Sequence, residues 1–313
     1  LEYRQLKDAV FAYTRDTLLA LQEKGVLPDI VQIGNEIRSG LLFPEGELPD
    51  YAGMTGLVNE GIRAARRVAD SSKMQIMIHL DQGGRYFYLK EWFQHAFEEG
   101  LMDFDLIGLS YYPFWHGTYT DLKETMERLV KDYGKPIMIV ESAYAWRKCE
   151  NGFIDEAQEK IAGFPASPEG QHKVLDLVNG IVASLPGQMG MGVFYWEPLC
   201  LPVNGVGAWA ENMGLLDESG RVLEGIHAFE FTREKYDPME WAKVYEPQEI
   251  TVGTGKQVTL PEEVSVLLMN GTLQRKRVKW QTEASVSFEK SGSFIIQGLV
   301  QEKMLPVSVS VRV

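Results

Sequence analysis

The chain has 313 residues, of which 45% are hydrophobic and 24% are charged, a composition typical of a folded protein with a substantial core. Its formal net charge of −13 argues against a nucleic-acid-binding protein, which would more often be basic. The two cysteines, Cys149 and Cys200, exclude a disulfide framework and a paired-cysteine metal motif, and whether they form a single bridge stays open. No stretch is long and apolar enough to cross a membrane. Because the chain starts at Leu1, the lack of a visible signal peptide says nothing about export.

The first part of the chain alternates between helical patterns and short apolar strands. The expected strands are Ile30–Ile33, Met74–His79, Leu106–Ser110, Ile137–Val140 and Met191–Tyr195. Apolar residues with helical spacing occur over residues 1–24, 57–68, 89–97, 122–133, 168–185 and 223–231, while 142–168 is expected to be a long irregular loop. Five strand-then-helix cycles predict a parallel sheet with right-handed crossovers, as in an α/β protein of the (β/α)8 barrel type.

Carboxyl groups follow two of these strands at the point where each strand ends. Asn35 and Glu36 come after the first strand, and Glu141 follows the fourth. The carboxyl ends of parallel strands form the rim where barrel enzymes carry their chemistry. Glycosidases use two carboxyl groups that flank one bond, so Glu36 and Glu141 are candidates for an acid/base and a nucleophile. Taken alone, Glu36 also fits a helix cap or a solvent-facing side chain, and Glu141 also fits a salt-bridge partner for a neighbouring rim residue.

Aromatic side chains gather in the loops on the same side of the predicted sheet. Trp115, Trp146, Trp196 and Trp209 all fall in such loops. Indole rings can stack on the apolar faces of sugar rings, but aromatic residues also fill barrel ends. We favour stacking for Trp196, which directly follows a strand, and leave the other three open.

The histidines do not indicate a metal site. Neither His79 nor His116 has a second histidine at metal-ligand spacing, so hydrogen-bonding roles are expected for both.

The pattern changes after residue 236. Residues 237–247 are charged, carry a proline near each end and are expected to form a linker. Seven short alternating runs follow within 248–313: Ile250–Val252, Gln257–Leu260, Val264–Met269, Arg277–Trp280, Ser285–Phe288, Ser293–Ile296 and Val307–Val313. Short strands at this spacing predict a small β-sandwich, with Asn270-Gly271 as a hairpin turn.

Several motifs of the first part resemble those of the endo-β-1,4-galactanases, glycoside hydrolase family 53, within a clan of retaining (β/α)8 glycosidases. They are VQIGNEIRSG (31–40), MIHL (77–80), DLIGLSYYPFWHGT (105–118), IVESAYAW (139–146), FPASPEGQ (164–171) and GVFYWEP (192–198). The resemblance runs from Leu1 to about Phe231, in order and with sensible gaps. It implies retaining endo-hydrolysis of the β-1,4-galactan side chains of pectin.

The resemblance also implies residue roles. Glu36 would be the acid/base after the fourth barrel strand and Glu141 the nucleophile after the seventh, which Tyr111 or Tyr112 would orient. Trp196, after the eighth strand, would form the floor of the subsite at the cleavage point. The substrate-binding residues would be Asn35, His79, Tyr111, Tyr112, Trp115 and Trp196.

The sequence departs from the family pattern in two respects. The family's first three strands have no counterpart before Leu1, so residues 1–236 are expected to carry strands four to eight alone. Such a remnant has two open strand edges, and we expect it to be inactive alone or to associate with another copy or another polypeptide. Some family members bind calcium after the seventh strand, but residues 147–163 lack an Asp/Asn-rich run, so no metal or other cofactor is expected.

The tail from Gln248 resembles a bacterial immunoglobulin-like domain, which would serve as a spacer or surface-presentation module. Together the two resemblances predict a secreted, periplasmic or cell-surface protein that acts on a plant cell-wall polysaccharide and binds no nucleic acid. Two alternatives stay open. One is a carbohydrate-binding protein without turnover, and the other is a related clan glycosidase that cleaves another β-linked polymer.

Overall fold

The computed structural model describes residues 1–149, 152–201 and 210–313. The chain divides into two compact units, Leu1–Lys235 and Tyr236–Val313, and each is considered by itself. In the described ranges, no helix combines the length and the apolar character that a membrane span requires.

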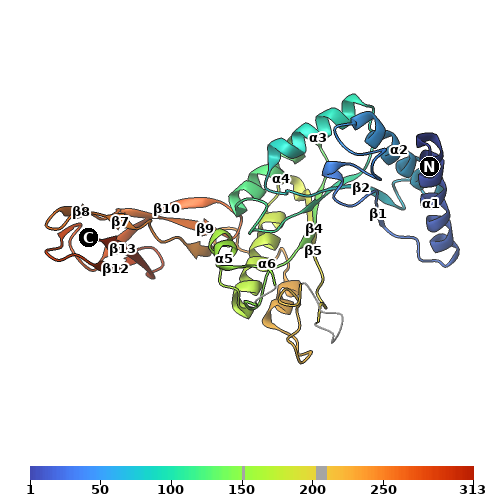
Figure 1. Cartoon of the computed structure of the whole chain (residues 1–313). Helices are drawn as coiled ribbons and strands as arrows, with labels where there is room; N and C mark the ends of the chain where they lie inside the picture. Colours follow the sequence, from blue (N-terminus) through green and yellow to red (C-terminus); the bar gives the residue numbers. More distant parts are fainter. Residues whose placement is uncertain (150–151, 202–209) are drawn as a thin grey trace. The chain divides into compact units, whose positions relative to one another are not determined.

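The first unit is built on a parallel sheet whose five strands lie side by side in sequence order (Figure 1). The strands are β1 (Ile30–Gln32), β2 (Gln75–Leu80), β3 (Leu106–Ser110), β4 (Ile137–Ser142) and β5 (Gly190–Tyr195). The helices are α1 (Tyr3–Glu23), α2 (Tyr51–Val68), α3 (Tyr86–Glu98), α4 (Tyr119–Tyr133), α5 (Glu156–Ala162) and α6 (Pro168–Ala183). The described residues of the unit also form three 3-10 helices: η1 (Ile37–Ser39), η2 (Pro186–Gln188) and η3 (Glu224–Glu230). This is the expected succession of β/α cycles, with β1 and β5 as the edge strands.

The inner strands β2 and β3 are buried on both faces, as is usual for parallel strands, whereas the edge strands β1 and β5 are only partly buried. Met77, Leu106 and Met138 form one apolar cluster, against which the partly buried Ile30 and Val140 pack. Successive side chains of a strand point to opposite faces, so His79 lies on the same face as Met77. The sequence of β2 therefore directs an imidazole to the end of the strand on the clustered face.

Three details of the first unit differ from the expectations. The expected loop 142–168 contains helix α5, which Asp155 caps by accepting a hydrogen bond from Gln158 N, and which ends at Gly163 with φ +79°. The segment expected as a last helix is a 3-10 helix, η3. Strand β4 continues to Ser142, so Glu141 lies inside the strand rather than after it.

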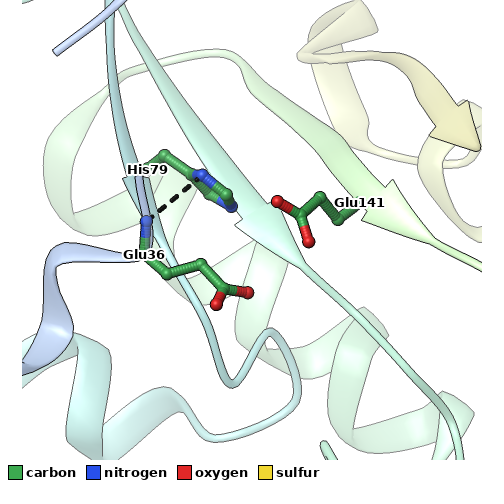
Figure 2. A group of neighbouring side chains, drawn as sticks. All are labelled: Glu36, His79 and Glu141. Atoms are coloured by element: carbon green, nitrogen blue, oxygen red, sulfur yellow. Dashed lines mark hydrogen bonds between the residues drawn. The ribbon is translucent and has the colours of Figure 1, made fainter. Parts of the chain in front are cut away.

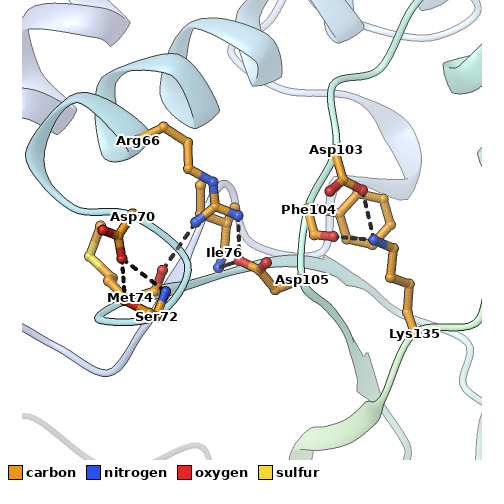
Figure 3. A network of polar contacts seen from close by, with 9 residues as sticks. All are labelled: Arg66, Asp70, Ser72, Met74, Ile76, Asp103, Phe104, Asp105 and Lys135. Carbon is orange, nitrogen blue, oxygen red and sulfur yellow. Dashed lines mark hydrogen bonds and ion pairs between the residues drawn. The ribbon is translucent and has the colours of Figure 1, made fainter.

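A polar network ties the strands together at the end opposite to the carboxyl rim (Figure 3). Arg66 of α2 forms an ion pair with Asp105, just before β3, and donates a hydrogen bond to Met74 O at 3.1 Å. The Asp105 carboxylate also accepts a hydrogen bond from Ile76 N at 2.6 Å. Lys135, just before β4, donates to Asp103 in the same network. These bonds fix the starts of β2, β3 and β4 relative to α2.

The second unit is an all-β structure with a six-stranded sheet in the order β6-β9-β10-β12-β13-β7 and a two-stranded sheet, β11-β8. The strands are β6 (Trp241–Val244), β7 (Ile250–Thr251), β8 (Gln257–Thr259), β9 (Glu263–Leu268), β10 (Leu273–Trp280), β11 (Ser285–Ser287), β12 (Ser293–Val300) and β13 (Leu305–Arg312). Its core contains Val258, Val264, Trp280, Val300 and Val309.

All seven strands expected in the tail are present, but the segment expected as a linker, 237–247, contains an eighth. This strand, β6, pairs antiparallel with β9, so the all-β unit begins earlier than expected. The turn at Asn270-Gly271 joins β9 to β10 as a hairpin, and Gly271 supplies the φ of +78° that the turn needs.

Candidate active site

Glu36 reaches the rim through a tight turn after β1. Gly34 has φ +79°, and a Cβ there would lie 2.4 Å from Cγ2 of Ile37, so the turn requires glycine. Glu36 itself has φ 49° and ψ 48°, a left-handed conformation that is uncommon for this residue. Strained backbone of this kind clusters at functional sites, where the surrounding structure holds it in place.

Glu141 enters the same region from β4. The pairing of β3 with β4 shifts register between Leu109 and Ser110, so that Ser110 pairs with Glu141. The Tyr112 hydroxyl donates a hydrogen bond to Glu141 Oε2 at 3.2 Å. Burial and, second, the negative charge of Glu36 raise the pKa of Glu141, and the hydrogen bonds from Tyr112 and Asn35 oppose this in part.

Figure 2 shows the carboxyl groups of Glu36 and Glu141 pointing toward one another, with the imidazole of His79 beside them. One carboxylate oxygen of each glutamate and one nitrogen of His79 all lie within 4.8 Å of one another. The two acids are 105 positions apart in the chain, and the parallel sheet brings them to one point of its rim.

His79 lies under this pair and is fully buried. Its Nδ1 lies 3.2 Å from Asn35 Oδ1 and 3.4 Å from Glu36 N, and its Nε2 lies 2.9 Å from Ser110 Oγ. Burial lowers the pKa of His79 to about 4, although the charge of Asp81 opposes the shift. The imidazole is therefore neutral at pH 7 and holds the Asn35-Glu36 turn by contacts rather than by charge.

The two carboxyl groups open into a cavity of about 310 Å³. Its lining consists of Asn35, Glu36, Asp81, Tyr112, Phe114, Trp115, His116, Glu141, Phe153, Trp196 and Met213. Six of the eight residues selected from the sequence thus meet at one cavity, with the buried His79 beneath them. Of the two tyrosines left open, Tyr112 faces Glu141, whereas Tyr111 is fully buried and its hydroxyl donates to Gly117 O. Trp209 lies outside the described residues.

Asp81 was not among the residues selected from the sequence, yet it lines the cavity and forms an ion pair with Arg38 at 2.8 Å. Its place directly after β2 is the same signal that selected Glu36 and Glu141. Phe153 was also missed, and its ring meets Trp115 edge-on with centroids 5.1 Å apart. Phe153 lies in a loop and does not directly follow a strand, so no sequence pattern indicated that it would line the cavity.

The donor groups at the site do not suit calcium. Glu36, His79 and Glu141 are close enough to hold a metal ion, but calcium takes six to eight oxygen ligands and no imidazole. The loop in which the family resemblance implies calcium includes 150–151, which lie outside the described residues. In its described part, Asp155 caps α5, and Glu159 accepts from Ala166 N and pairs with Lys148 at 3.1 Å.

The parallel sheet and the facing acids at its carboxyl rim place the first unit in the class of β/α-barrel hydrolases. The sequence model described as "Glycosyl hydrolase family 53" matches residues 1–229, and "Bacterial Ig-like domain (group 4)" matches residues 245–303. The chain belongs to glycosyl hydrolase family 53. The expected fold class, a barrel of this type with its last five strands followed by an immunoglobulin-like unit, is confirmed.

Proteins of similar sequence or structure support this family assignment. An uncharacterized protein of Niallia circulans is 38% identical over 246 residues, which are 73% of this chain and 66% of that protein. An arabinogalactan endo-beta-1,4-galactanase of Cellvibrio japonicus is 34% identical over 74% of this chain and 64% of its own length. The structure of the Ignisphaera aggregans GH53 catalytic domain superposes with a TM-score of 0.66 and 32% identity, covering 73% of this chain and 66% of that one. The chain thus spans about two thirds of the length of these relatives.

Proposed function

We propose that the first unit hydrolyses β-1,4-galactosidic bonds inside galactan chains, with retention of configuration. The observation that carries this proposal is the approach of Glu36 and Glu141 within 4.8 Å at the carboxyl rim. Retaining glycosidases hold their two carboxyl groups about 5–5.5 Å apart, while inverting ones need about 6.5–9.5 Å to admit a water. The galactanase names of the relatives support the choice of substrate.

The proposed reaction has two steps, and each balances its protons. Glu36 first gives its proton to the glycosidic oxygen that departs, while the Glu141 carboxylate attacks the anomeric carbon and forms a glycosyl ester. Glu36, now ionised, then takes a proton from a water that attacks the same carbon and frees Glu141. The Tyr112 hydroxyl, 3.2 Å from Glu141 Oε2, orients the nucleophile. The two carboxyl groups and water supply every atom, so we propose that no cofactor takes part.

The lining of the cavity suits a neutral sugar polymer. Trp115 and Trp196 offer rings on which the apolar face of a galactose unit can stack. Asn35, next to the acid/base in the chain, offers an amide for a sugar hydroxyl. We propose pectic galactan side chains as the substrate, and a location outside the cytoplasm, where the second unit spaces or presents the first at a surface.

We also propose that a second copy of the chain covers exposed apolar surface beside edge strand β1. A groove of about 440 Å³ runs there between α1 and β1, lined mostly by apolar side chains that include Val10, Leu18 and Ile33, and by Tyr13, which is 76% exposed. Sedimentation equilibrium should therefore show a dimer that Tyr13→Lys weakens. A monomer at every concentration would refute this association, whatever the activity.

The test of function is release of reducing ends from β-1,4-galactan, mannan and xylan. We expect cleavage of galactan alone, and we expect Glu141→Gln to reduce it at least about 10³-fold because the nucleophile is lost. NMR of the first product should show a β-anomer. Retention on galactan without product would instead indicate a binding protein. Product from mannan or xylan would indicate a related glycosidase, and an unchanged rate in Glu141→Gln would refute the assigned roles.

A further inference from the structure

A second cavity, of about 370 Å³, lies between α3 and α4 and does not include the proposed catalytic residues. We call it the α3–α4 cavity. Its main side chains are Tyr86, Phe87 and Tyr88 of α3 and Asp121, Glu124 and Arg128 of α4. The two helices are neighbours in the outer layer of the first unit (Figure 1). The volume is in the range of ligand sites, which begins at about 300 Å³.

The first turn of α3 presents two large aromatic rings to solvent at this cavity. Phe87 is 71% exposed and Tyr88 is 58% exposed, although both are apolar enough to favour burial. Single exposed aromatics are common, but two consecutive ones at the mouth of a cavity form a patch. Tyr86 holds the ring of Phe87 in place, because Tyr86 is buried and the two rings meet edge-on with their centroids 5.3 Å apart.

The polar side of the cavity offers both donors and acceptors that are not used within the protein. The Arg128 guanidinium lies 3.5 Å from the centroid of the Tyr86 ring and 5.0 Å from that of Phe87, which holds it in place. Within the part of the chain that the structure describes, the side chains of Arg128 and Glu124 form no hydrogen bond or ion pair. They are one helical turn apart on the same face of α4.

The charges of the cavity balance. Arg85 and Arg128 supply two positive charges, and Asp121 and Glu124 supply two negative ones. A balanced set does not favour an anionic or a cationic ligand, whereas an acceptor beside a fixed donor suits vicinal hydroxyls. Exposed rings with adjacent donors and acceptors are therefore the recognition chemistry of a neutral carbohydrate.

The cavity lies close to the catalytic rim. Gly84 lines it, and a Cβ on Gly84 would lie 2.1 Å from the carbonyl oxygen of His116, whose side chain lines the catalytic cavity. Asp81, which also lines the catalytic cavity, is only three residues before Gly84. A polymer bound at one cavity is thus held beside the other.

We propose that the α3–α4 cavity is a second carbohydrate-binding site, which holds a neutral β-galactan chain by stacking on Phe87 and Tyr88 and by hydrogen bonds to Glu124 and Arg128. The choice of galactan rests on the proposed function, whereas the choice of a neutral sugar rests on the cavity itself. The site would keep the polymer near the catalytic rim between cleavage events.

Affinity electrophoresis in gels that contain soluble β-1,4-galactan tests this site, in a Glu141→Gln background so that the polymer stays intact. The double variant Phe87→Ala/Tyr88→Ala should show about tenfold weaker retardation, and Phe229→Ala, which removes another exposed aromatic ring, should show none of this loss. Gels with polygalacturonate, an acidic chain, should retard none of these proteins. Thermal unfolding checks that each variant is folded, and Glu124→Gln/Arg128→Gln replaces the alanine pair if that pair unfolds.

Retardation of the Phe87→Ala/Tyr88→Ala protein equal to that of its background overturns the site, as does a background protein that galactan does not retard. The neutral-sugar assignment is overturned if polygalacturonate retards the background protein and the Phe87→Ala/Tyr88→Ala variant loses that retardation but keeps its retardation on galactan. These outcomes are separate from the proposed function. Absence of galactan cleavage by the parent protein would refute the hydrolase while leaving a Phe87- and Tyr88-dependent retardation in place.

Discussion

The buried imidazole of His79 should make the stability of the first unit depend on pH in a measurable way. In the folded protein burial lowers the pKa of His79 to about 4, while in the unfolded chain it returns to about 6.5. Between these values the unfolded state binds one more proton than the folded state. The free energy of unfolding is therefore highest above pH 6.5 and falls as the pH is lowered toward 4.

The size of the effect follows from the shift. A difference between 6.5 and about 4, at about 1.4 kcal/mol per pH unit, corresponds to about 3 kcal/mol of stability that is lost over this interval. The Ser110 and Asn35 contacts at 2.9 and 3.2 Å hold the ring where water cannot reach it, so the protonated form has little solvation to gain. This loss is a substantial fraction of the stability of an ordinary domain.

Urea unfolding at a series of pH values, with the parent and His79→Gln compared, isolates the contribution. His79→Gln should be less stable than the parent at pH 7. Between pH 6.5 and 4, however, its free energy of unfolding should decrease by about 3 kcal/mol less than that of the parent. Glu141 has a raised pKa and opposes this trend, yet it is present in both proteins and cancels in the comparison.

Two results would refute the reasoning. One is an NMR titration in which the His79 ring protonates near pH 6.5 in the folded protein. The other is an identical pH dependence of unfolding in the parent and His79→Gln, since the imidazole would then not resist protonation.

Two further predictions concern opposite ends of the sheet. Tyr112→Phe removes the hydroxyl that favours ionised Glu141, so the pKa of Glu141 should rise further and the acidic limb of kcat/KM should move to higher pH; an unmoved limb would contradict the assigned hydrogen bond. Arg66→Met leaves the carboxylate of Asp105, which is 17% exposed, without its ion-pair partner and should lower the free energy of unfolding by about 2 kcal/mol in urea. The exposed neighbour substitution Arg67→Met should change it by less than about 0.5 kcal/mol, and equal effects of the two would argue against the network.

The main elements and the two acids were predictable because they depend on local patterns. The strand Leu106–Ser110 was predicted with its observed bounds, since a run of apolar residues is bounded by polar ones on both sides. The rim positions of Glu36 and Glu141 followed from the rule that parallel strands present their chemistry at one end.

The details that failed depend on pairing between distant segments. Glu141 lies inside β4 because the register with β3 shifts at Ser110, which no local pattern encodes. Only geometry separates Tyr111 from Tyr112, since consecutive side chains leave the backbone in different directions and one of them must enter the core. Strand β6 was hidden by the charged and proline-rich residues around it, and its partner β9 lies some 20 residues further along the chain.

The bonds of Arg66, Asp105 and Lys135 at the starts of the strands have a practical consequence. The anchoring network and the proposed catalytic residues occupy opposite ends of the same strands, so substitutions that strengthen the anchored end should leave the geometry of Glu36 and Glu141 untouched. Engineering for heat resistance can therefore begin there, with altered turns and added ion pairs, and spare the residues that face a substrate.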